Sequence, residues 1–151
     1  MTIMTDYPYL GAHFRLEVDD SEVVDFSECT GLAGEIGVEE FEEGGENRFA
    51  HRFPARGSVP NLVLKRGMTA HAGLWDWYAE YLAVGTVAPR DGQVLLLTSV
   101  GGELAPVRVW AFTRGWPVKM TGPDLNAMSP AVAVESIEIA HHGVTLVPAL
   151  P

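Results

Sequence analysis

The chain has 151 residues, of which 47 % are hydrophobic and 20 % are charged, and its formal net charge is −10. This length and composition fit a single globular domain over residues 1–151 and exclude a disordered chain. Twenty acids against ten bases argue against binding a nucleic-acid backbone, which requires clustered Lys and Arg. The negative charge either serves solubility or keeps a polyanion from adhering as it slides past.

The sequence also indicates the cellular compartment in which the protein is made and assembled. No apolar run reaches the roughly 18 residues that cross a bilayer, so we expect no membrane anchor. The first eleven residues lack the basic start and the apolar core of a signal peptide. Cys29 is the only cysteine and forms no internal disulfide, which agrees with a reducing cytosol. We expect a protein that is made and assembled in the cytoplasm.

The N-terminal region predicts a β-hairpin. Phe14, Leu16 and Val18 alternate with charged residues, which is typical of a half-buried strand. Residues 19–21 have turn chemistry, and residues 23–26 form the returning strand. Residues 27–34 are interpreted as a connection of small residues.

A second, charged hairpin is predicted over about residues 36–53. Its first leg is acidic and its return leg, residues 48–53, is basic and ends at Pro54. Gly44-Gly45 between the legs is a hairpin-tip signal, because primed turns need positive φ angles. Opposite charges across the strands stabilise such a pair by a few tenths of a kcal/mol to about 1. The hairpin has little apolar surface to bury on its own body, so it is either an arm that contacts another subunit or a solvated loop.

One amphipathic helix is predicted over about residues 70–84, after a short apolar strand at residues 61–65. Its expected helix-to-sheet core recurs at positions i, i+3, i+4, i+7 and i+8 and consists of Leu74, Trp77, Tyr78, Tyr81 and Leu82. Thr69 is the expected N-cap, and Gly85 the expected left-handed residue after the last turn. Trp75 lies about 200° from Trp77 around the helix, so we expect one of the two to be available to a partner.

The rest of the chain predicts further strands. Residues 93–98 are nearly all apolar, as in a strand covered on both faces, and residues 107–112 continue the sheet. Trp116-Pro117 precedes a short strand at residues 118–120. In the last strand, residues 132–140, the apolar side changes between Val134 and Ile137. This change predicts a β-bulge near Glu135-Ser136 or a change of partner there.

No constellation of residues predicts catalysis or a bound cofactor. The five histidines lack ligand spacing, and His141-His142 would point to opposite faces of a strand. Cys29 has no neighbouring base, which favours a small buried thiol. We therefore expect no catalytic, metal or cofactor-binding residue, and the arm, the sheet edges and a spare aromatic suit assembly.

Several blocks occur in order along the chain: residues 27–32, 38–47, 60–67, 74–78, 122–127 and 134–141. Together they resemble the tail-tube proteins of contractile phages and the inner-tube proteins of phage-tail-like contractile injection systems. The resemblance implies a sandwich-like or barrel-like β-fold of two sheets with one helix. It also implies hexameric rings whose sheets join into a continuous barrel, and rings that stack into a rigid tube.

The resemblance further implies partners and an interface. The expected partners are other copies of the chain, a surrounding sheath, baseplate or hub and terminator proteins, and effector cargo or DNA in the lumen. The hairpin matches the family's arm that contacts an adjacent subunit or ring. The expected interface residues are Glu39, Glu40, Glu42, Glu43, Gly44, Gly45, Glu46, Asn47, Arg48, His51 and Arg52.

Two alternatives remain open from the sequence. A tube-initiator paralogue that joins the tube to the baseplate would carry extra loops or a further domain. A ligand-binding β-barrel or an enzyme would need convergent polar groups in a pocket, and the sequence shows none. Neither the cargo nor the choice between phage, bacteriocin-like particle and injection system follows from the residues.

Overall fold

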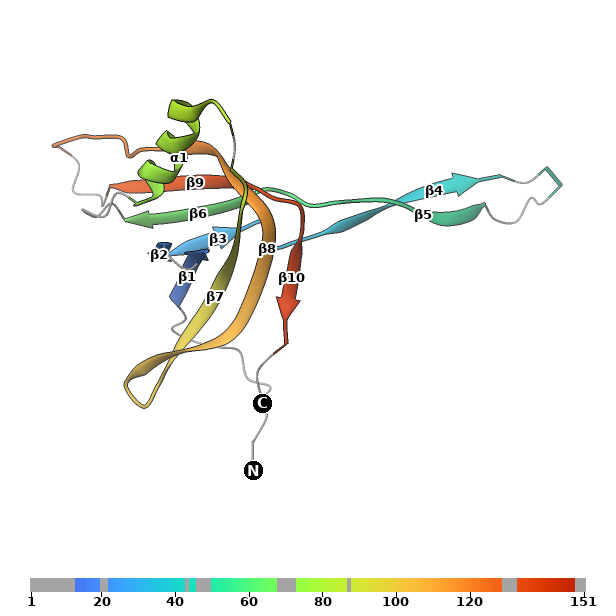
Figure 1. Cartoon of the computed structure of the whole chain (residues 1–151). Helices are drawn as coiled ribbons and strands as arrows, with labels where there is room; N and C mark the ends of the chain where they lie inside the picture. Colours follow the sequence, from blue (N-terminus) through green and yellow to red (C-terminus); the bar gives the residue numbers. More distant parts are fainter. Residues whose placement is uncertain are drawn as a thin grey trace.

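The computed structural model describes residues 13–19, 22–42, 44–45, 50–67, 73–86, 88–128 and 133–148. These residues form a mainly β fold with one helix, as the sequence predicts (Figure 1). The elements are β1 (His13–Val18), β2 (Glu22–Phe26), β3 (Glu28–Thr30), β4 (Glu35–Phe41), β5 (His51–Ser58), β6 (Leu62–Gly67), α1 (Gly73–Val84), β7 (Arg90–Val100), β8 (Glu103–Thr121), β9 (Val134–Ala140) and β10 (Val144–Val147).

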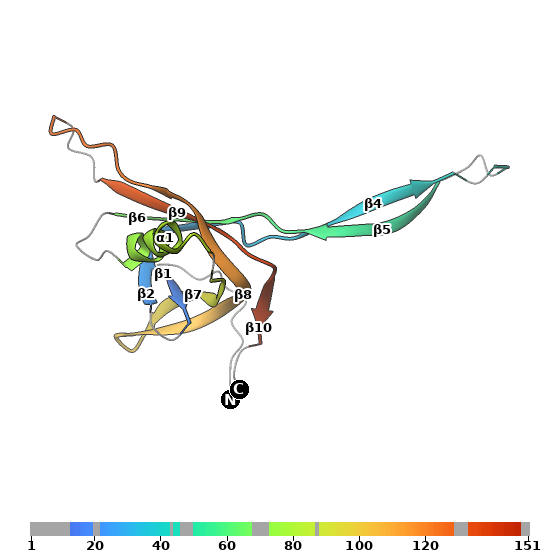
Figure 2. The ribbon, with the colours of Figure 1, turned by 45° about the horizontal axis from the view of Figure 1, so that its top comes forward.

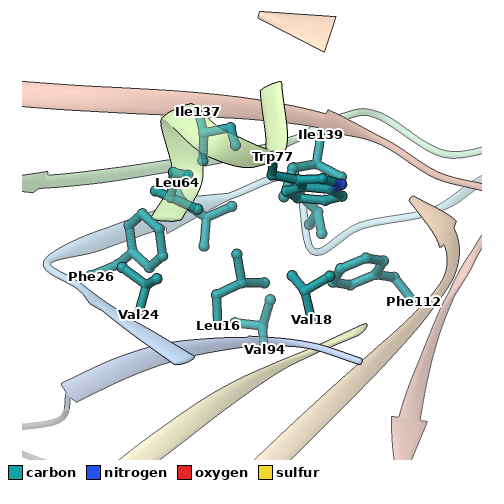
Figure 3. Close-up of a cluster of buried hydrophobic side chains, with 12 residues drawn as sticks. Leu16, Val18, Val24, Phe26, Leu64, Trp77, Val94, Phe112, Ile137 and Ile139 are labelled. Carbon is teal, nitrogen blue, oxygen red and sulfur yellow. The ribbon is translucent and has the colours of Figure 1, made fainter. Parts of the chain in front are cut away.

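Eight of the strands form one sheet in the order β2-β1-β7-β8-β9-β6-β3, with β10 also paired to β8. This sheet folds over, so that β1 and β7 face β6 and β9 across the core (Figure 3). The described strands do not close into a barrel, because β2 pairs only with β1 and β3 only with β6. Strands β4 and β5 form a separate two-stranded sheet. The predicted architecture of two sheets and one helix is confirmed.

The core lies between the two layers. Alternation along β1 and β2 directs Leu16, Val18 and Val24 inward, where they meet Ile137 and Ile139 of β9 (Figure 3). The predicted N-terminal hairpin is confirmed, since β1 and β2 pair from Phe14↔Phe26 to Val18↔Glu22.

Helix α1 closes one end of this core with its first turns. Leu74 and Trp77 are 2 % and 6 % exposed. Tyr81 and Leu82, expected in the helix-to-sheet core, are instead 38 % and 64 % exposed, because only the first two turns of the helix pack on the sheet. Tyr78 is half-buried.

The end of α1 has the expected geometry. Gly85 has φ +72°, and its N–H donates to the carbonyl of Tyr81 at 3.0 Å. This is the left-handed stop that ends many helices. The predicted start at residue 70 and the cap Thr69 lie outside the described residues.

The 19-residue strand β8 passes from one layer to the other. Its residues 103–115 pair with β7, and its residues 116–121 pair with β9. Arg114, with φ +52°, lies at the change of partner. The predicted break at Trp116-Pro117 is wrong, because Trp116 pairs with Ala140 and the register shift that accommodates the proline comes directly after it.

The predicted bulge or change of partner near Glu135-Ser136 in β9 is also wrong. The register with β6 is continuous from Leu62↔Ile139 to Gly67↔Val134. Glu135 is buried on the same face as Ile137 and Ile139, while Val134 is 46 % exposed. The apparent change of apolar side arises because the inward position 135 holds an acid.

Two short strands and one extension were not predicted. Strand β3 lies within the expected connection at residues 27–34, and β10 follows the histidine pair. Strand β5 continues past Pro54 to Ser58, with a register shift between Ile36 and Val38 opposite it. A two-stranded ribbon tolerates this proline, since edge strands need not donate every N–H.

Candidate assembly surfaces

The β4–β5 hairpin, here called the arm, projects far from the folded body (Figures 1 and 2). It is a ribbon of two strands, and none of the other described strands pairs with it. Glu40 and Arg52 are register partners, and the Arg52 Nε lies 3.6 Å from the Glu40 Oε1. Both side chains are more than 60 % exposed, so this pair contributes at most about 1 kcal/mol. This described ion pair therefore adds little stability to the arm.

The structure brings together the part of the predicted interface that it describes. Glu39, Glu40, Glu42, Gly44, Gly45, His51 and Arg52 all lie on the arm. Gly45 has φ +106° in the turn, and the His51 ring stacks on Phe53 with centroids 6.5 Å apart. Glu43, Glu46, Asn47 and Arg48 lie outside the described residues.

The arm also exposes large apolar side chains, which the charge pattern did not reveal. Ile36, Val38, Phe41 and Phe53 are between 52 % and 67 % exposed. An isolated two-stranded ribbon is marginally stable in water, and contiguous exposed apolar groups mark interaction sites. The arm thus has the composition of a segment that a partner covers.

Open strand edges form a second kind of assembly surface. Among the described strands, β2 pairs only with β1 and β10 only with β8. Each leaves a row of backbone N–H and C=O groups without a strand partner, which is a template for pairing with another chain.

Trp75 is partly exposed, but its indole N–H is engaged. The indole Nε1 donates to the Glu135 Oε2 at 3.2 Å, and the ring is 39 % exposed. The other carboxylate oxygen of Glu135 accepts from the Arg66 Nε, and both of these charged residues are buried. No local pattern predicts the contact between Arg66 and Glu135, since the two residues are 69 positions apart in the chain.

His141 and Cys29 are two further side chains with the potential to react. The buried His141 contacts the Pro60 carbonyl through Nε2 at 3.0 Å, while its Nδ1 accepts from the Gly143 N–H at 3.0 Å. Burial raises the pKa of the Cys29 thiol to about 11. Among the described residues, no three His, Cys, Asp or Glu side chains converge on a point that would hold a metal ion. The helix in this part of the chain is also too short and polar to cross a membrane.

Comparisons with known proteins relate the chain to tail tubes. The family model of the T4-like virus tail tube protein gp19 matches residues 11–145. No curated protein matches the sequence.

Solved structures share the fold. A chain in the tube-terminating cap of the anti-feeding prophage is 24 % identical, with a TM-score of 0.80, over 99 % of this chain and 97 % of that chain. A chain in the sheath–tube complex of the extracellular contractile injection system PVC is 24 % identical, with a TM-score of 0.79, over 95 % and 94 %. Hcp1 from Flavobacterium johnsoniae is 14 % identical, with a TM-score of 0.53, over 89 % and 94 %.

Proposed function

The chain belongs to the T4-like virus tail tube protein family, and on this premise we propose that its copies form hexameric rings that stack into the inner tube of a contractile tail or injection particle. Its role is structural rather than catalytic. The tube lies inside a sheath, meets a baseplate at one end and a terminator at the other, and conducts DNA or effector cargo. The similar folds in the anti-feeding prophage cap and the PVC sheath–tube complex support this arrangement.

The arm is the observation that carries the proposal. It projects from the body (Figure 2), none of its described residues belongs to the buried core, and these residues expose both charged and large apolar side chains. A second subunit or ring that covers the arm would bury these apolar groups and keep water from the charged pairs. Glu39 to Arg52 then form the subunit or ring interface, with opposed Glu and Arg residues favouring one register.

Negative-stain electron microscopy of the purified protein at increasing concentration tests the proposal. The wild-type chain is expected to form rings and stacked tubes. A variant in which Asn-Gly replaces residues 42–50 joins β4 to β5 by a two-residue turn and removes the arm tip. We expect this variant to form markedly shorter tubes, because the part of the proposed interface at residues 42–50 is lost.

A matched control changes a turn on the body. Gly101→Asn alters the β7–β8 turn, where nothing lies within 4 Å of an added Cβ, and leaves the arm intact. Its tubes should match the wild type in length. Tubes of wild-type length from the arm variant would refute the interface. A monomer at every concentration, also on co-expression with baseplate components, would refute the tube itself.

A further inference from the structure

The loop that follows β8, residues 122–128, presents two uncovered apolar side chains. Leu125 is 81 % exposed and Met128 is 92 % exposed, which makes them the most exposed large apolar side chains in the described part of the chain. Neither residue contributes to the core. Two such groups on one short loop indicate a contact surface.

One hydrogen bond holds the turn of this loop, and the base of the loop lies beside Trp75. The Asn126 Oδ1 accepts the N–H of Met128 at 2.9 Å. At the base, a Cβ on Gly122 would lie 3.6 Å from the Trp75 ring, and the Trp75 indole is itself held by Glu135. A surface that is ordered before binding loses less entropy when a partner covers it.

A groove on the arm has complementary chemistry. It is lined by Ile36, Gly37, Val38, Arg52, Phe53 and Pro54 and has a volume of about 370 Å³. Arg52 is the only charged residue in this lining, and its exposed guanidinium also lies 3.6 Å from Glu40 across the strands. Asp124 is the only charged residue in the loop. Apolar contact and one opposite charge therefore match across the two surfaces.

We propose that residues 122–128 of one copy bind the arm groove of a neighbouring copy. The arm and the loop reach out on opposite sides of the body, so the two surfaces of one chain do not meet each other (Figures 1 and 2). The contact is therefore heterologous, with each copy giving its loop to one neighbour and its groove to another. Heterologous contacts generate closed rings or continuous stacks. The inference rests on the proposed tube function and names the surface that receives the arm.

Disulfide trapping between copies tests this contact. In a Cys29→Ala background, one chain carries both Val38→Cys and Leu125→Cys, at positions that are 53 % and 81 % exposed. Oxidation of assembled tubes should give a ladder of cross-linked chains on a non-reducing gel. The control chain carries Leu82→Cys with Leu125→Cys, since Leu82 is 64 % exposed, which is at least as accessible as Val38, but lies on the helix.

The outcomes separate this inference from the proposed function. A ladder from the Val38 pair but not from the Leu82 pair supports the contact. Tubes without a Val38–Leu125 cross-link, or with equal ladders from both pairs, overturn the contact and leave the tube function in place. If neither the wild-type chain nor any variant assembles, the loop–arm contact and the proposed tube function are both refuted.

Removing either charge gives an independent test of the same contact. Asp124→Asn and Arg52→Gln should each lower the yield of the trapped ladder about three-fold, as expected for an exposed ion pair. The double variant should lose no more yield than either single variant, because the pair is already broken. Additive loss in the double variant would overturn the pairing of these two residues.

Discussion

Arg66 and Glu135 place two opposite charges inside the fold. Their side chains are 6 % and 3 % exposed, and they are register partners on β6 and β9. Removing one member of such a pair leaves the other charge buried with less compensation, which is far more costly than losing an exposed pair. Glu135 also accepts a hydrogen bond from the Trp75 indole, whose ring lies beside Gly122 at the base of the β8–β9 loop.

We expect Glu135→Ala to lower the free energy of unfolding by about 3–5 kcal/mol, because it removes a carboxylate that pairs with buried Arg66. Urea unfolding of the free subunit measures this change. Glu28→Ala is the matched control, since its carboxylate lies 3.9 Å from the Lys65 Nζ at an exposed site. The control should lower the free energy of unfolding by at most about 1 kcal/mol. Similar losses of stability in the two variants would contradict the role of burial.

Cys29 should react slowly with alkylating reagents in the folded protein. Burial raises its pKa from 9.0 to about 11, so at pH 8 the folded chain holds about 100-fold less thiolate than the unfolded chain. Mass spectrometry of iodoacetamide labelling, with and without urea, measures the ratio. Equal labelling rates in the two states would show that the thiol is not desolvated.

The same shift gives the direction of a pH effect. The folded state holds the thiol proton more tightly than the unfolded state, so the contribution of Cys29 to stability is fully present below pH 9. It is lost as pH rises from 9 to about 11. Cys29→Ser should remove this component of the alkaline decline in stability.

At the scale of elements, strands with an alternating pattern were predictable from the sequence. Features that depend on contacts between distant strands were not. Phe14, Leu16 and Val18 reveal β1 because a half-buried strand needs only its own pattern. Glu135 reads as a break in the pattern of β9 because its partner, Arg66, comes from a distant strand. Trp116-Pro117 reads as a break in β8 because the bend that carries the strand between layers depends on the tertiary fold.

The arm was predictable in its charges and its turn, but not in its apolar side chains. Gly44-Gly45 between an acidic and a basic leg indicates a hairpin from local chemistry alone. Exposure of Val38 and Phe41 depends on how far the arm stands from the body, and no local pattern encodes that distance. The exposure of Leu125 and Met128 was not predictable either, because it also depends on how far their loop stands from the body.

Helix α1 offers a direct test of which of its faces packs. Trp77→Ala should lower the free energy of unfolding by about 3–5 kcal/mol, because it opens a cavity among Ile139 and its neighbours (Figure 3). Leu82→Ala should change it by less than about 0.5 kcal/mol, since this side chain is 64 % exposed. Thermal unfolding of the free subunit distinguishes the two, and a large loss from Leu82→Ala would place that residue in the core.

At the scale of the whole molecule, stability is divided between a packed body and an unsupported arm. The body buries its core between two layers, whereas β4 and β5 pair only with each other. Local opening costs little where few apolar contacts must be broken. In the free subunit the arm should therefore open on its own, and assembly should stabilise it more than any other described segment.

Amide hydrogen exchange measures this difference. In the free subunit we expect fast exchange in β4 and β5, and in assembled tubes exchange at least about ten-fold slower, because a neighbouring copy covers the ribbon. Amides of β6 and β9 serve as the internal control, since they lie in the core layer and should be protected in both states. Protection of the arm in the free subunit would mean that the ribbon is stable alone. Fast exchange of the arm in tubes would mean that no neighbour covers it, and either result would contradict the arm's role in assembly.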